Sequence, residues 1–88
     1  MTDSSQQIRD ATREFILAEF LPGEPPEDLE DSTPLIAGAI VDSIGIMKLV
    51  LFIHEKFGVE IEPHEMSAEF LGTITDIVKN VSAKIAQT

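Results

Sequence analysis

Apolar residues recur at the spacing of an α-helix in three segments of this chain, and this pattern constrains the fold more than any other feature. The clearest stripe consists of Ile74, Ile77, Val78, Val81 and Ile85. A stripe of this period covers one face of a helix and must pack against other apolar surface. Together with similar stripes earlier in the chain, it predicts helices over residues 5–20, 43–57 and 73–86.

The segments between these helices carry residues that interrupt regular structure. Residues 21–42 contain four of the five prolines, which exclude a regular helix from much of this stretch. We therefore expect a long loop that Leu35 and Ile40 hold against the core. Residues 63–71 are predicted to form a short helical segment, after an extended link whose Val59 and Ile61 point inward.

These elements define one expected fold. A chain of 88 residues suits a single domain, and three apolar stripes in so short a chain must share one core. The sequence predicts an all-α fold, a small four-helix bundle with three long helices and one short helix. The long loop joins its first and second helices, and residues 1–88 form one domain.

Charge excludes several classes of function. The net charge is −10, so phosphate backbones and anionic membranes would repel this surface.

No cysteine is present, which suits a reducing cytoplasm and leaves no thiolate metal site. Residues 1–7 lack the basic and apolar parts of a signal peptide, and no apolar run approaches the length of a membrane span. We expect a cytoplasmic monomer whose partners are proteins.

The second predicted helix opens on Asp42 and Ser43. Either side chain can accept a hydrogen bond from a free backbone N–H, so one interpretation makes Ser43 only the N-cap of the helix. The other interpretation uses the same N–H groups and the helix dipole, which would favour a negatively charged group attached to the Ser43 hydroxyl. Gly45 weakens this first turn, which indicates either that space is needed there or that the residue has no role.

Catalytic and metal-binding patterns are missing from the sequence. His54 follows Ser43 by eleven residues, about 16 Å along one helix, so it cannot act as the base of a hydrolytic triad. The chain has no glycine-rich phosphate loop, no paired histidine motif and no calcium loop. We therefore predict no catalytic residue and no metal site, and we do not expect an independent enzyme.

Asp42, Ser43 and Ile44 resemble the Asp-Ser-Leu/Ile motif of acyl and peptidyl carrier proteins. The resemblance extends over nearly the whole chain. It includes the helix order, the long acidic loop, Thr33–Leu35 upstream of the motif, and Leu49, Ile53 and Phe57 at core positions of that family.

Membership of this family implies a swinging thioester carrier. The resemblance implies that a phosphopantetheinyl transferase attaches 4′-phosphopantetheine from coenzyme A to Ser43, using magnesium. An adenylating ligase or acyltransferase would then load an acyl or aminoacyl group on the arm, and synthase or tailoring enzymes would use it. The carrier would supply position and effective concentration rather than catalytic groups.

The resemblance also places a partner surface beside Ser43. We assign it to Asp42, Ile44, Met47, Lys48 and Leu51, with Met47 and Leu51 as exposed apolar contacts. The alternative for these two residues is ordinary core filling, in which case both would be buried.

Three positions differ from fatty-acid carriers, which usually hold acidic residues where this chain has Gly45, Lys48 and His54. The sequence therefore resembles stand-alone aminoacyl or peptidyl carriers of specialised metabolism more closely, and a fatty-acid carrier is the alternative. A hypothesis from another class is an unmodified acidic interaction module that docks on a basic partner protein.

Overall fold

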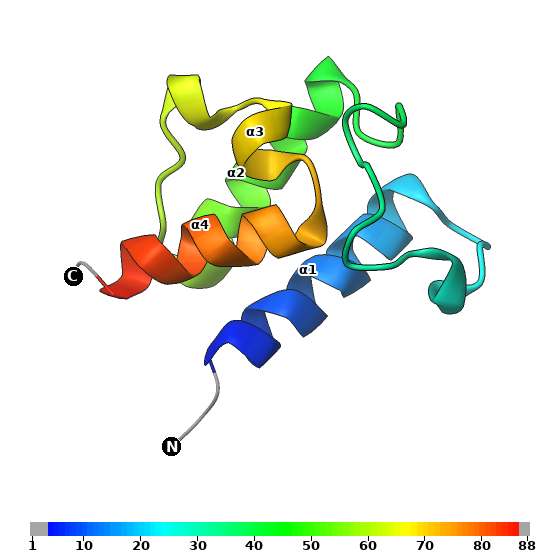
Figure 1. The fold of residues 1–88 in the computed structure, drawn as a ribbon, viewed down its shortest axis with the longest axis horizontal. Helices are drawn as coiled ribbons and strands as arrows, with labels where there is room; N and C mark the ends of the chain where they lie inside the picture. The colour runs from blue at the N-terminus through cyan, green and yellow to red at the C-terminus, as the bar shows by residue number, and fades with distance from the viewer. Residues whose placement is uncertain (1–3, 87–88) are drawn as a thin grey trace.

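A computed structural model describes residues 4–86 of this protein, and all regular elements within that range are helices (Figure 1). The helices are α1 (Ser4–Phe20), α2 (Ser43–Phe57), α3 (Ala68–Leu71) and α4 (Ile74–Ala86). Two short 3-10 turns, η1 (Pro26–Asp28) and η2 (Pro63–Glu65), lie in the connections. The prediction of an all-α four-helix bundle is confirmed.

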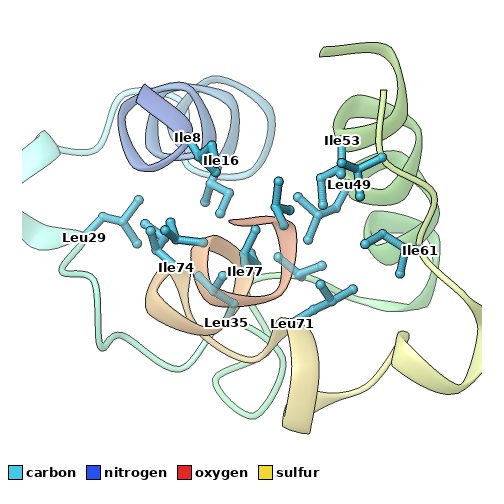
Figure 2. Packing of buried hydrophobic residues seen from close by; sticks show 14 residues of the cluster. Ile8, Ile16, Leu29, Leu35, Leu49, Ile53, Ile61, Leu71, Ile74 and Ile77 are labelled. Carbon is cyan, nitrogen blue, oxygen red and sulfur yellow. The ribbon is translucent and has the colours of Figure 1, made fainter. Parts of the chain in front are cut away.

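Helix α4 is the centre of the core. Its stripe is buried at Ile74, Ile77, Val78 and Val81, whereas Ile85 lies at the edge and is 36% exposed. Figure 2 shows labelled side chains of α1, α2 and the long loop directed toward α4. These are Ile8 and Ile16 from α1, Leu49 and Ile53 from α2, and Leu29 and Leu35 from the loop.

The loop between α1 and α2 contributes as much to the core as a helix does. Leu29, Leu35 and Val41 are almost completely buried. The expectation for Leu35 and Ile40 is confirmed, since Leu35 is inside the core and the half-buried Ile40 packs against it, while Val41 beside Ile40 is more completely buried. A backbone hydrogen bond also ties the loop to the segment before α4, since the Leu35 N–H donates to the carbonyl of Gly72 at 2.7 Å.

An ion-pair cluster holds the acidic part of the same loop to α1. Arg9 Nε lies 2.8 Å from a carboxylate oxygen of Asp31. Arg13 pairs with the other oxygen of Asp31 and also donates to the carbonyl of Leu29. Two arginines of α1 thus share one carboxylate of the loop, and all three side chains are partly buried.

The predicted short helical segment at 63–71 is divided in the structure into η2 and α3. Val59 and Ile61 before it are buried as expected. The interruption falls at Met66 and Ser67, and α3 is one helical turn. Helix α4 then begins at Ile74, with the Thr73 hydroxyl accepting from the Asp76 N–H at 3.0 Å.

Candidate functional site: a serine at the start of α2

Asp42 is the N-cap of α2. Its backbone is extended, and its carboxylate accepts a hydrogen bond from the Gly45 N–H at 2.7 Å. This bond satisfies one of the N–H groups that the first turn of a helix leaves without an intrahelical partner. The carboxylate of Asp42, which we predicted as part of the partner surface, therefore has a structural role at the same place.

Ser43 is the first helical residue and is exposed to solvent. Its hydroxyl has no hydrogen-bond partner among residues 4–86. The interpretation of Ser43 as only an N-cap is wrong, because Asp42 performs that function. A hydroxyl that stabilises nothing and lies at the surface is open to chemical modification.

Gly45 leaves room at the start of α2 for the ring of Phe20, the last residue of α1. A Cβ atom on Gly45 would lie 2.7 Å from Cε1 of Phe20 and 3.1 Å from the Asp42 carboxylate. Such distances are shorter than van der Waals contact. The glycine thus lets the Phe20 ring pack directly against the first turn of α2, which fixes the position from which Ser43 projects.

An apolar stripe lies on the outer face of α2, beginning beside Ser43. Ile44, Met47 and Leu51 are 69%, 59% and 56% exposed. The core-filling alternative for Met47 and Leu51 is therefore wrong. Lys48 lies on the same side of α2, and its ammonium pairs with Glu19 of α1 at 3.1 Å.

An open groove of about 530 Å³ runs along this stripe. It is lined by Ile44, Met47, Lys48, Val50, Leu51, His54, Glu60 and Ile61. The groove begins one residue after Ser43 and reaches the third turn of α2. Its far wall comes from the segment that follows the helix. Because Ile44, the residue after Ser43, lines the groove, a long and flexible substituent on the hydroxyl would have apolar surface close by.

The family model described as "Phosphopantetheine attachment site" matches residues 15–81 of this chain. The chain belongs to the family of phosphopantetheine-dependent carrier proteins. It is 34% identical over 62 residues to an acyl carrier protein of Chlamydia muridarum, covering 70% of this chain and 78% of that protein. It is also 30% identical over 56 residues to an acyl carrier protein of Wolinella succinogenes, covering 64% and 71%.

Members of this carrier family hold 4′-phosphopantetheine as a prosthetic group, and the start of α2 has the features that such a group requires. A phosphodiester is an anion, and a helix N-terminus favours anions through its free N–H groups and its dipole. The cap bond between Asp42 and Gly45 uses one of these N–H groups. The first turn has others, and the hydroxyl of Ser43 adjoins them.

The carrier's groove includes residues that sequence reasoning missed. His54 could have been found by extending the stripe Ile44, Met47 and Leu51 by three more residues, because these positions share one helix face. Glu60 and Ile61 carry no local signal, since they reach the groove only through the path of the chain after α2.

Within residues 4–86, no group of three or more His, Cys, Asp or Glu side chains could hold a metal ion. None of the helices over residues 4–86 is both long and apolar enough to cross a membrane.

Proposed function

We propose that Ser43 Oγ is the atom to which 4′-phosphopantetheine is attached in this carrier protein. The observation that carries the proposal is the exposed Ser43 hydroxyl, which has no hydrogen-bond partner among the described residues and lies at the N-terminus of α2 beside an apolar groove. When bound, the group supplies a thiol on which acyl or aminoacyl groups are held as thioesters.

The chain's own residues position this group and leave bond making to partner enzymes. Asp42 and Gly45 fix the first turn of α2 through their hydrogen bond, so the direction in which Ser43 projects is constant. A tether of fixed origin raises the effective concentration of cargo at a docked active site. This role requires no general base close to Ser43.

The partner surface is the apolar stripe of α2. Ile44, Met47 and Leu51 occur at spacings of three and four residues, and all are more than half exposed. Large exposed side chains of this kind dominate binding energy when a partner covers them, and methionine adapts to partners of different shape. Asp42 and Lys48 lie at the border of this surface, where phosphopantetheinyl transferases and acyl-handling enzymes would dock.

The cargo proposed here is an aminoacyl or peptidyl group of specialised metabolism. The support is the charge carried by α2, where Lys48 and His54 accompany Glu55, the one carboxylate within Ser43–Phe57. A partner with a strongly basic docking patch gains little from such a face. The second candidate is a fatty-acid carrier, which is favoured by the names of the two acyl carrier proteins that this chain resembles.

Mass spectrometry tests the attachment site. The purified protein is incubated with coenzyme A, magnesium and a phosphopantetheinyl transferase of broad specificity. We expect a mass increase of one phosphopantetheine group that is absent in Ser43→Ala and retained in Ser82→Ala, a serine on α4. If folded protein gains no mass, the unmodified interaction module becomes the better hypothesis.

A loading experiment tests the cargo. The modified protein is offered to an adenylating ligase for amino acids and to one for fatty acids. Thioester formation with amino acids supports the aminoacyl type, whereas loading by fatty acids alone selects the second candidate. Leu51→Ala should lower the loading rate without changing the fold, because it removes an exposed contact only.

A further inference from the structure

A second groove lies on the outer side of α4, apart from the site at Ser43. It has a volume of about 390 Å³. Two residues of α3 and four of α4 line it, namely Glu69, Phe70, Asp76, Lys79, Asn80 and Ala83. None of these residues lines the groove beside Ser43, so the two grooves are separate surfaces.

The helical period places the second groove on the side of α4 that faces away from the core. Successive residues of a helix are turned by about 100°, so Asp76, Asn80 and Ala83 share one face of α4. That face is opposite to the buried stripe of the helix. Leu49 and Ile53 of α2 lie on the side of the buried stripe (Figure 2). A molecule bound in the second groove would therefore leave the exposed stripe of α2 free.

Asn80 brings an amide without a partner to the wall of this groove. Its Nδ2 atom is shielded from solvent, yet it donates to no acceptor among residues 4–86. A shielded donor that lacks an acceptor is unfavourable, and most such groups in proteins have one. The last torsion of an asparagine side chain is soft, so a small rotation would turn the donor toward an acceptor in the groove.

The charged residues around Asn80 favour a neutral ligand that both accepts and donates hydrogen bonds. Glu69 and Asp76 contribute carboxylates, and Lys79 contributes an ammonium. Among residues 4–86, no ion pair engages these three groups. The two carboxylates would repel an anionic ligand, whereas an ammonium ion would offer no acceptor to Asn80. A peptide amide meets both requirements, because it has a carbonyl and an N–H.

We propose that the second groove binds an extended segment of a partner protein through a backbone amide. The carbonyl of that amide accepts from Asn80 Nδ2, and its N–H donates to the carboxylate of Asp76. An apolar side chain next to the amide packs on Ala83 and on the ring of Phe70, which an edge contact with His64 supports at 5.9 Å between centroids. The groove lies at the lower end of the usual range of pocket volumes, which suits a short segment.

This second surface would let the carrier hold two proteins at once. A partner attached to α4 could remain bound while one enzyme after another uses the exposed stripe of α2, since the two surfaces lie on different sides of the molecule. Retention of the carrier by one partner raises its effective concentration near enzymes linked to that partner.

Nuclear magnetic resonance of a single labelled residue tests the groove. Asn80 is the only asparagine of the chain, so labelling with ¹⁵N-asparagine marks its backbone and side-chain amides alone. Ser43→Ala protein is titrated with N-acetyl-leucine methylamide, so the result does not depend on the attachment proposal. We expect saturable shifts of the Asn80 side-chain signals, with half-saturation in the millimolar range. Absence of saturation would overturn the proposal.

Two related ligands test the preference for a neutral amide. N-acetyl-leucine carries a carboxylate and leucine methylamide carries an ammonium, and both retain the leucine side chain. Each should bind severalfold more weakly than N-acetyl-leucine methylamide, and the loss for N-acetyl-leucine should shrink at high salt, which screens the carboxylates. Equal binding of the three ligands would contradict recognition through the amide.

Matched variants separate binding from folding. In uniformly labelled protein, saturation at Phe70 should disappear in Asn80→Leu and persist in Gln6→Leu, which removes an exposed amide of α1. Ala83→Leu, at an exposed position of the groove, should also weaken binding because it fills the space. Asn80→Leu should be at least as resistant to urea as the parent, since it removes a donor without an acceptor. Lower stability of Asn80→Leu would mean that the amide serves the fold, and would overturn the proposal.

Discussion

At the residue scale, the contact between Gly45 and Phe20 joins the start of α2 to the end of α1. The ring of Phe20 occupies the volume that a larger side chain at Gly45 would need, with 2.7 Å between Cε1 and the position of the added Cβ. A helix ordinarily prefers alanine to glycine by about 1 kcal/mol. At this position we expect the contact with Phe20 to reverse that preference.

We predict that Gly45→Ala destabilises the protein. Forcing extra volume into a packed site costs about 1–3 kcal/mol, which exceeds the helix preference of about 1 kcal/mol. Urea denaturation should therefore give a lower free energy of unfolding than for the unmodified sequence. In a Phe20→Ala background, which removes the ring, the same change should be neutral or stabilising. An increase in stability in the unmodified background would contradict this account.

Asp42, and not Ser43, caps α2. The two residues should therefore differ in their effect on stability. Asp42→Ala removes the cap on the Gly45 N–H and should lower stability by about 1 kcal/mol, within a usual range of 0.5–2 kcal/mol. Asp42→Asn should retain most of that stability. Ser43→Ala should change it by less than about 0.5 kcal/mol, as expected for a surface position without contacts. Thermal unfolding followed by circular dichroism measures all three.

At the scale of elements, an ion pair joins η2 to the last turns of α4. Lys84 Nζ lies 2.8 Å from Oε1 of Glu65, and the same oxygen accepts from the Glu62 N–H at 2.8 Å. Burial pushes the pKa of Glu65 upward, but the Lys84 and Glu62 hydrogen bonds and the charges of Lys84 and His64 outweigh it, so that the pKa lies below its usual value. The folded state thus favours the ionised form.

This lowered pKa predicts acid sensitivity of the link between η2 and α4. A carboxylate whose pKa is lower in the folded than in the unfolded state adds stability above its unfolded pKa, and loses that contribution as pH falls through the folded value. We expect the free energy of unfolding to fall below about pH 4.5, and to fall less steeply in Glu65→Gln. Denaturation curves between pH 3 and pH 7 test this.

Removal of the partner cation should have a local effect as well. Lys84→Met leaves the Glu65 carboxylate largely buried without its ion pair, which should cost about 1–3 kcal/mol at neutral pH. Hydrogen exchange should then accelerate in residues 59–66 more than in α1. Uniform acceleration throughout the protein would mean that the pair stabilises the whole fold rather than this link.

At the scale of the whole molecule, the long loop is a structural part of the core. Leu35 has no measurable exposure, and its backbone N–H bonds to Gly72. A protein of this size has a total stability of roughly 4–13 kcal/mol. Loss of the contacts of one fully buried leucine of the loop would therefore remove a large share of the folding free energy.

A buried and an exposed leucine should differ strongly in their contribution to stability. Leu35→Ala should cost about 2–5 kcal/mol, because it leaves a cavity in the core. Leu51→Ala, at a position that is 56% exposed, should change stability by no more than about 0.5 kcal/mol. Urea midpoints of the two variants measure the difference. Similar losses would mean that Leu51 also supports the core.

The sequence by itself determined which segments are helical and which residues share a helix face. These properties are local, because the 3.6-residue period fixes the direction of each side chain along a helix. The stripe of α4 and the start of α2 at Asp42 and Ser43 could therefore be predicted. The motif around Ser43, together with the helix order and the acidic loop, also indicates the carrier family.

Only the tertiary structure decided which local possibilities are realised. It buries Val41 more completely than Ile40, exposes Met47 and Leu51, and brings Phe20 against Gly45. Each outcome depends on segments that are distant in sequence and compete for the same volume around α4. Periodicity defines the faces of a helix, but packing determines which face is covered, and here it leaves the face beside Ser43 open.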